Sequence, residues 1–418
     1  MNSKDKLDVK DIAKSLNDDL AILQPLSDEC CIYRAPERVR KLYEESYTPQ
    51  LVSIGPLHHG KEKLKAMEEH KRRYLLDFLQ WSDSSLVNLI TYIKQNERRL
   101  RNCYAETIEY GSEKFVKMMS LDATFIIMLL LKNHCPQLRS NNIDRIFYKP
   151  KMISYLWYDI ILLENQVPFF ILEELFKFSN KAELVEGLSM IKLTRSFFEG
   201  CMGYWVTNDE EKDFSQVKHF IDFLRICQLP QKKKQEGSIN KLVMPTATEL
   251  HHAGVKFEMH PSRNKLDIEF DKGILKIPHI TMSHEVELLL RNVLTFECCH
   301  FDNLYFNDYI LLVSKLLISG NDVEILDRGG IIDNRQENNE AVASFLRNTI
   351  CYVNPNMFYF SDVVEDLNSY EKSIWHRWNA KLRQNYFNTP WTGISVVAAG
   401  ILLILTIIQT ACSILQII

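Results

Sequence analysis

The chain has 418 residues, of which 46% are hydrophobic and 25% charged, with a formal net charge of -4 at pH 7. This composition excludes a disordered or fibrous protein, and the nearly balanced charge gives no electrostatic case for nucleic-acid binding. The ten cysteines include no C-x-x-C spacing and the first 20 residues contain no apolar signal-like stretch, so we expect reduced thiols and a cytosolic body.

Residues 1–28 form a polar N-terminal tail, in which DIAKSLNDDLAIL favours a weak amphipathic helix. After this tail, residues 30–60 mix Pro, Gly and apolar residues, as loops and short extended segments do. From residue 61 to 229, apolar residues recur at helical spacing, which indicates successive helices. We expect helices over 61–80, 84–110, 112–133, 152–178, 182–200 and 214–229. Pro168 must end or kink the fourth of these, because proline lacks a backbone donor and clashes with the preceding turn.

The segment PQKKKQEGSINK, residues 230–241, has the composition of a linker. Apolar and polar residues then alternate, at Val255, Phe257 and Met259 and again at Leu266, Ile268 and Phe270. This alternation and the following GILKIPHI predict two or three short antiparallel strands near 253–280. Helices resume over 284–300, 308–319, 322–330, 340–350 and 363–382. The predicted fold of the body, residues 29–386, is mainly α with a small antiparallel β insert (α+β).

Residues 387–418 are predicted to be a C-terminal transmembrane helix. No charged residue occurs from Trp391 to Ile418, and about 20 apolar residues suffice to cross a bilayer. The anchor residues expected in contact with membrane lipid are Trp391, Ile394, Val397, Gly400, Leu403, Leu405 and Ile408. A buried core helix is the alternative.

Basic residues precede this segment and none follows it. The positive-inside rule therefore predicts a single-pass, tail-anchored protein with its body in the cytosol. The length of the segment suits either the plasma membrane or the endoplasmic reticulum. The small residues AAG at 398–400 are only weak support for a homo-oligomer, so the oligomeric state stays open.

Two histidine-containing motifs are candidate ligand sites. His58 and His59, in SIGPLHHG, are adjacent, and neighbouring side chains on an extended segment point apart, which disfavours one shared metal ion. We favour a structural role in a Gly-Pro turn. In ECCH, residues 297–300, the side chains fan out around a helix, so we expect one thiol in the core and His300 near the helix end rather than a metal site.

Three carboxylates, Asp122, Asp159 and Glu164, lie in strongly apolar segments. Buried acids require partners, and acids with perturbed pKa values also gather at active sites. Glu164 belongs to LLENQVP, just before Pro168, where polar side chains can bond the backbone groups that a proline leaves free. We favour a structural polar network with Arg34, Arg38 or Arg40 as counter-charges. An acid/base site is the alternative.

No sequence motif indicates a cofactor. The chain has no phosphate-binding G-x-x-x-x-G-K-[ST], no G-x-G-x-x-G, no G-x-S-x-G and no H-E-x-x-H. We therefore expect no cofactor and no nucleic-acid partner.

Several blocks of the sequence, in the same order, strongly resemble a plant protein family. They are IYRAPERVRKL, YTPQLVSIGPLHHG with MEEHKRRYL, LLENQVPFFILEEL, ATELHHAGVKF, RNVLTFECCH and HRWNAKLRQNYFNTPW followed by an apolar end. The family is DUF247, also called UPF0481, and the resemblance covers roughly residues 29–416. It implies a plant protein with one C-terminal membrane span. Some grass members resemble self-incompatibility determinants, and no catalytic motif carries over.

Together these observations predict a membrane-anchored, non-catalytic interaction or recognition protein with an unidentified protein partner. The alternative is a membrane-tethered enzyme that uses buried Asp or Glu residues with His58 or His300.

Overall fold

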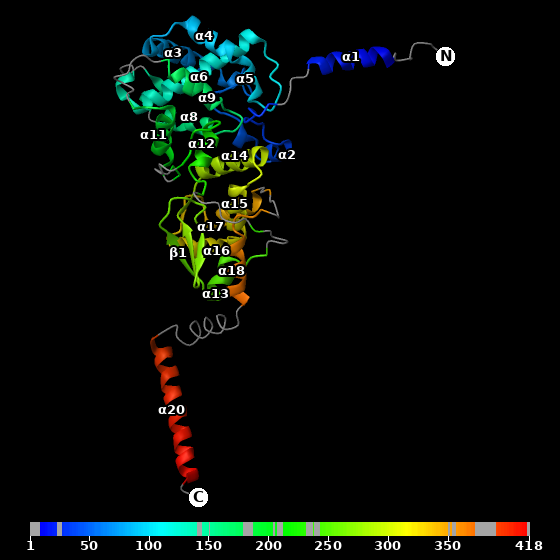
Figure 1. The fold of residues 1–418 in the computed structure, drawn as a ribbon. Helices are drawn as coiled ribbons and strands as arrows, with labels where there is room; N and C mark the ends of the chain where they lie inside the picture. Colours follow the sequence, from blue (N-terminus) through cyan, green and yellow to red (C-terminus); the bar gives the residue numbers. More distant parts are fainter. Residues whose placement is uncertain are drawn as a thin grey trace.

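The computed structural model is mainly helical, with two small sheets (Figure 1). It describes residues 9–22, 27–139, 144–149, 151–178, 187–203, 205–206, 212–230, 237, 243–349, 352, 357–372 and 390–415. Within helices, the side chains of residues 10, 19, 21–22, 390–397 and 411–415 also lie outside this description. Apart from Pro230 and Gly237, the predicted linker at 230–241 falls outside it. Gly237 forms an isolated antiparallel bridge with Phe358.

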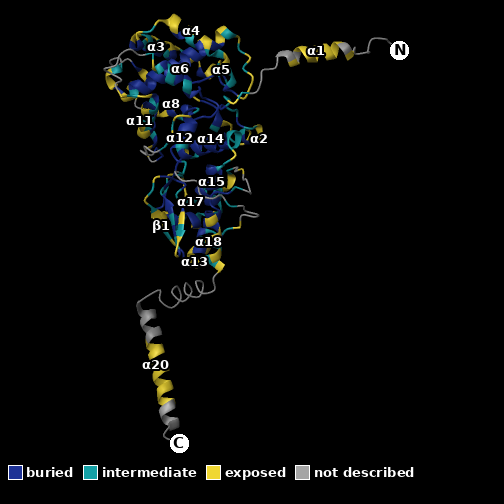
Figure 2. Ribbon diagram, viewed as in Figure 1, coloured by how far each residue is buried: buried dark blue, intermediate teal, exposed yellow. Residues whose placement is uncertain are grey.

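The first half of the body is a helical bundle around α6. Helix α6 is hydrophobic on all faces, as a helix surrounded by others must be, and its middle is buried (Figure 2). Helices α3, α4, α9 and α11 pack around it. The helices of this half are α2 (Glu37–Arg40), α3 (Ala66–Ser82), α4 (Leu86–Gln95), α5 (Glu97–Asn102), α6 (Ser112–His134), α7 (Arg145–Tyr148), α8 (Met152–Ile160), α9 (Phe169–Phe176), α11 (Met190–Met202) and α12 (Phe220–Ile226). Short 3-10 turns η1 (Glu44–Tyr47), η2 (Glu62–Leu64) and η3 (Pro136–Leu138) join them.

The second half continues from this bundle through α14, which packs against α12 on one side and α15 on the other. Two helices of this half begin with a capping box. Thr246 and Glu249 form the one at α13, and Ser319 and Asp322 form the one at α16. Helix α16 ends at Arg328 and Gly329 is its C-cap residue, as the Gly-Gly pair at 329–330 predicts. The helices are α13 (Ala247–His252), α14 (His284–His300), α15 (Tyr305–Leu316), α16 (Gly320–Arg328), α17 (Asn339–Asn348) and α18 (Ser361–Lys372).

The helix predicted over 152–178 is two helices. Helix α8 ends at Ile160, the chain turns through 161–168, and α9 begins at Phe169 with Pro168 as its N-cap residue. The proline therefore ends the pattern, as expected. The helix predicted over 363–382 is described as far as Lys372.

The prediction of an antiparallel β insert was wrong in part, because the sheet is mixed. Strand β3 (Ile274–Pro278) is central, parallel to β1 (Lys256–His260) and antiparallel to β2 (Glu269–Asp271). Among the described strands, only β2 and β3 form a hairpin, through Lys272 and Gly273. Both have positive φ, as a tight two-residue turn requires.

A second, two-stranded parallel sheet pairs β4 (Ile280–Met282) with β5 (Ile332–Asn334). Strand β5 was not predicted, because three residues are too few to show a period of two.

Two helices flank the body in sequence, α1 (Val9–Ile22) and α20 (Pro390–Leu415). Helix α1 confirms the amphipathic helix expected in the polar tail. In α20 the side chains of residues 398–410 are described, and Leu403, Leu405 and Ile408 are exposed. No helix long and apolar enough to cross a membrane is found among the residues with described side chains, which in α20 are 398–410.

Candidate functional site

The turn between α8 and α9 buries three consecutive polar side chains. Glu164, Asn165 and Gln166 are each 1% exposed. Residues 161–168 cross the core without regular secondary structure, so their backbone groups cannot bond each other as in a helix, and side chains must supply the partners. We call the segment 161–168 the core turn.

Three hydrogen-bond donors and the His58 imidazole surround the Glu164 carboxylate, and all come from the segment 34–58. The backbone N–H of Ala35 donates to Oε1 at 3.0 Å, and Arg40 pairs with the same oxygen. Arg34 Nη1 lies 3.2 Å and His58 Nε2 3.0 Å from Oε2. Glu164 thus fastens three separate points of the N-terminal segment to the core turn.

The charges of this cluster follow from burial and contact. Burial opposes ionisation of Glu164, but the His58 and Arg40 contacts prevail and hold its pKa below the ordinary value. Burial lowers the pKa of His58, against the effect of Glu164. Near neutral pH we therefore expect an ionised Glu164 beside a neutral imidazole. Neither ring nitrogen of His58 has a hydrogen-bond partner among the described residues, so the 3.0 Å approach of Nε2 to Glu164 is a close contact without hydrogen-bond geometry.

Asn165 and Gln166 bond the backbone that the core turn leaves free. Asn165 Oδ1 accepts from Ile54 N at 2.7 Å, and its Nδ2 donates to Val52 O and Asp159 O. Gln166 Nε2 donates to the carbonyls of Ile160 and Leu162 at the end of α8. These are the bonds expected of polar residues before Pro168.

Asp159, at the end of α8, has its own backbone partners. Its two oxygens accept from the N–H groups of Gln50, Leu51 and Val52, at 2.6 to 2.8 Å. Burial nevertheless raises its pKa. Asp159 does not contact Glu164 through its side chain, so these two acids hold adjacent parts of the same segment independently.

Asp122, on α6, pairs with a lysine that the sequence did not suggest. Lys71 Nζ lies 2.6 Å from Asp122 Oδ1, and Gly55 N donates to Oδ2 at 2.8 Å. Both side chains are nearly inaccessible. Burial raises the pKa of Asp122 to about 6, a shift that Lys71 opposes. This pair fastens α3 and the Gly55 turn to α6.

The remaining two histidines lie apart from Glu164. His59 packs its ring edge against Tyr110, with centroids 5.6 Å apart. His300 is the last residue of α14; its Nδ1 lies 2.8 Å from Tyr33 Oη and its ring stacks on Phe296. The structure therefore brings together His58 and Glu164, and leaves His59, Asp122, Asp159 and His300 in separate contacts.

The prediction that one thiol of ECCH lies in the core was wrong. Cys298 and Cys299 are half-buried, and the inaccessible residue is Glu297. Its Oε1 accepts from Arg225 Nε at 3.0 Å, and its Oε2 accepts from the backbone of Phe306 and Asn307. The signal available was a carboxylate on the apolar face of α14, one turn from Val293.

The sequence reasoning also missed His219, which precedes α12. Its Nδ1 accepts from Asp222 N, and Nε2 lies 2.9 Å from the carbonyl oxygen of Cys31. Burial lowers its pKa to about 3. Its position as an N-cap residue was the available signal, although histidine is an uncommon choice there.

The cluster around Glu164 stabilises a buried carboxylate, and a substrate could not reach it from solvent in this structure. The six candidate side chains line none of three cavities among the described residues, those beside α12, beside Trp205 and beside Tyr47. The described residues also contain no group of three His, Cys, Asp or Glu side chains suited to a metal ion. The geometry fits a fastening role for Glu164.

Comparison with known proteins identifies the family. The model of DUF247, described as a plant protein of unknown function, matches residues 32–405. The chain belongs to the DUF247 family. The matched range includes the N-terminal segment, the core turn and all six candidate residues.

Two relatives of this DUF247 chain come from Arabidopsis thaliana. UPF0481 protein At3g47200 is 29% identical over 428 residues, covering 93% of this chain and 87% of the relative. Putative UPF0481 protein At3g02645 is 21% identical, covering 90% and 89%. No solved structure matches the chain.

Proposed function

We propose that this DUF247 protein is anchored in a membrane through α20 and that its body is a non-catalytic interaction module on the cytosolic side. The observation that carries the proposal is the outward-facing apolar surface of α20. Its seven exposed large side chains have relative exposures from 53% to 64%: Ile401, Leu402, Leu403, Ile404, Leu405, Ile407 and Ile408.

The dimensions and polar groups of α20 support this proposal. Its 26 residues correspond to roughly 39 Å of helix, against about 30 Å of bilayer hydrocarbon. Its hydroxyl groups are bonded within the helix: Thr406 Oγ1 donates to Leu402 O at 2.8 Å, and Thr410 Oγ1 to Thr406 O at 2.7 Å. Hydrocarbon offers no hydrogen-bond partners, so internal bonding of this kind suits a lipid surrounding.

The proposed role of the body rests on the state of its buried acids. Glu164 accepts from three donors and also contacts His58, and Asp159 accepts from three backbone N–H groups. Buried carboxylates whose oxygens already accept hydrogen bonds stabilise the fold of the body and are not free to react with a substrate. The proposal includes lipid contact by α20, an unidentified protein partner, and residence in the plasma membrane or endoplasmic reticulum.

Carbonate extraction of plant-cell membranes tests the anchor. The full chain should stay in the carbonate-washed pellet, and a chain lacking residues 387–418 should be released. Proximity labelling from a tag on the body would then test recognition. Recovery of a reproducible set of proteins beyond general membrane neighbours supports it, and recovery of general neighbours alone contradicts it.

One observation favours the second candidate, a membrane-tethered enzyme: His58 lies 3.0 Å from Glu164, and neither of its ring nitrogens has a hydrogen-bond partner among the described residues. A catalytic His58 must be reachable from solvent. Diethyl pyrocarbonate should modify the exposed His251 and spare His58 if the contact is structural. Rapid modification of His58 in the folded protein would favour the enzyme instead.

A further inference from the structure

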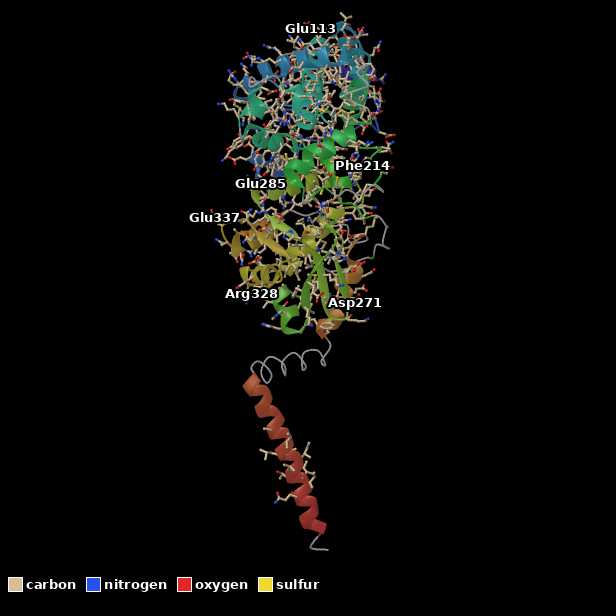
Figure 3. The ribbon with its side chains drawn as sticks, turned by 90° about the vertical axis from the view of Figure 1, so that its left-hand side faces the viewer. Glu113, Phe214, Asp271, Glu285, Arg328 and Glu337 are labelled. Atoms are coloured by element: carbon tan, nitrogen blue, oxygen red, sulfur yellow. The ribbon has the colours of Figure 1, made fainter. Side chains whose placement is uncertain are left out.

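We propose that the cavity beside α12 binds a small organic carboxylate that carries an apolar group. Its volume is about 460 Å³, within the usual range for small-molecule sites. One wall is the segment 212–218, which contains Phe214 (labelled in Figure 3), and others come from α12 and from Phe301, just after α14. This site is separate from Glu164 and independent of the membrane anchor.

Arg225 is the central feature of the cavity. Its side chain is 4% exposed, its Nε donates to Glu297 Oε1 at 3.0 Å, and its guanidinium carbon lies 3.7 Å from the centroid of the Phe301 ring. Its two terminal nitrogens donate no hydrogen bond among the described residues. The guanidinium is therefore held rigidly while its outer edge stays available, the arrangement that recognises a planar carboxylate.

Lys218 supplies a second cation. Its ammonium group makes no ion pair among the described residues, although it lines the same cavity. Its positive potential reaches the neighbouring histidines. Burial lowers the pKa of His300 to about 4, and Lys218 and Arg225 both add to this shift.

The two carboxylates that line the cavity are directed to backbone N–H groups. Asp222 accepts from Lys218 N at 3.0 Å and is 3% exposed, and Asp213 accepts from Ser215 N at 2.8 Å. Burial raises the pKa of Asp222, and Lys218 and Arg225 oppose that shift, so an incoming anion shares the field of these cations with Asp222. An incoming anion would gain charge-assisted hydrogen bonds from Arg225 and Lys218.

Part of the lining is apolar. Ile226, Leu229 and Pro230 join Phe301 along it. A bare anion leaves this surface in contact with water, whereas a ligand with an apolar body covers it and gains about 25 cal/mol per Å² of apolar area buried. The combination selects a carboxylate with a ring or short hydrocarbon chain over inorganic phosphate or acetate.

The test is a ¹⁹F NMR titration of the full chain in neutral detergent micelles, with empty micelles as background. The probe is 4-fluorobenzoate, and 4-fluorobenzamide is its neutral match. We expect the carboxylate to bind and the amide to bind at least tenfold more weakly. Acetate and inorganic phosphate should displace the probe only at much higher concentration than unlabelled benzoate.

Variants assign the binding to this cavity. Lys218→Gln should weaken 4-fluorobenzoate binding by about tenfold, the effect of one charge-assisted hydrogen bond. Lys315→Gln, at a half-buried lysine on α15, is the matched control and should leave binding unchanged. Arg225→Lys keeps the charge beside Glu297 but removes the fork, so it should weaken binding while the thermal transition persists. The proposal is overturned if 4-fluorobenzoate does not bind, if it binds no more tightly than the amide, or if Lys218→Gln leaves its affinity unchanged.

Discussion

His58 Nε2 and Glu164 Oε2 lie 3.0 Å apart in the interior, and each side chain is inaccessible to solvent. The contact joins the SIGPLHHG turn to the core turn between α8 and α9. Together with Arg34, Arg40 and the backbone of Ala35, it makes one carboxylate the meeting point of the N-terminal segment and the helical bundle.

Replacing Glu164 should therefore destabilise the body strongly. Glu164→Gln leaves Arg40 without its buried counter-charge, and removing one partner of a buried pair costs about 3–5 kcal/mol. Urea unfolding followed by tryptophan fluorescence measures this change. Glu106→Gln is the matched control, because Glu106 also pairs with Arg34, at 2.6 Å, but is 43% exposed. Its loss should cost under about 1 kcal/mol, and equal effects of the two variants would contradict the role of Glu164.

A methyl group at Gly55 should be poorly tolerated. The residue has φ +73°, and a Cβ atom would lie 2.5 Å from Gln166 O and 3.0 Å from Tyr104 Oη. Gly55→Ala should lower the free energy of unfolding by at least about 3 kcal/mol, since backbone strain and a clash with the core turn add.

Gly60→Ala distinguishes the cost of backbone strain from the cost of the steric clash. Gly60 has φ +85° and nothing within 4 Å of the added Cβ. Gly60→Ala should therefore cost only about 1 kcal/mol of strain. Thermal unfolding of both variants checks the comparison, and a Gly60 effect as large as that of Gly55 would show that the approach of Gln166 is unimportant.

Mild acid should weaken the fold through His219. Burial lowers its folded-state pKa to about 3, whereas the unfolded state takes up a proton near pH 6.5. Stability is thus fully present above pH 6.5 and falls as the pH drops toward 3, by up to about 1.4 kcal/mol per pH unit. In His219→Gln, the slope of unfolding free energy between pH 6.5 and 4 should be shallower than in the unmodified chain. Identical slopes would rule out His219 as the titrating group.

The sequence allowed prediction of most helices, because these follow from local patterns. For Glu164 it suggested Arg34, Arg38 or Arg40, of which Arg34 and Arg40 pair with it, and it missed His58 and the backbone of Ala35. Spacing of three or four residues marked α3, α6 and α14, and the proline rule located the break before α9. The order of strands in the sheet could not be predicted from the sequence. The pairing of β1 with β3 depends on a crossover through residues 261–268, and local alternation carries no information about strand direction.

Long-range pairing also limited prediction of the polar contacts. Lys71 with Asp122 and Arg225 with Glu297 are separated by 51 and 72 residues, and nothing local marks them as partners. Likewise, the separation of His58 from His300 follows only from the packing of α14.

Charged substitutions in α20 should reduce membrane association in steps. An arginine near the centre of a span costs about 2.5–3.5 kcal/mol by insertion measurements. Leu403→Arg should lower the carbonate-resistant fraction, and Leu403→Arg with Leu405→Arg should lower it further. Leu76→Arg on α3 is the control, since Leu76 is similarly exposed, at 57%, but lies in the body. A loss of association for Leu76→Arg alone would locate the membrane contact elsewhere.

Flotation of the purified full chain with neutral phosphatidylcholine liposomes tests the central claim most directly, because such vesicles offer hydrocarbon without a charged surface. We expect the chain to rise with the liposomes through a density gradient containing 1 M salt, and the chain lacking 387–418 to stay at the bottom. A full chain that remains at the bottom, or a shortened chain that floats equally well, would contradict the account.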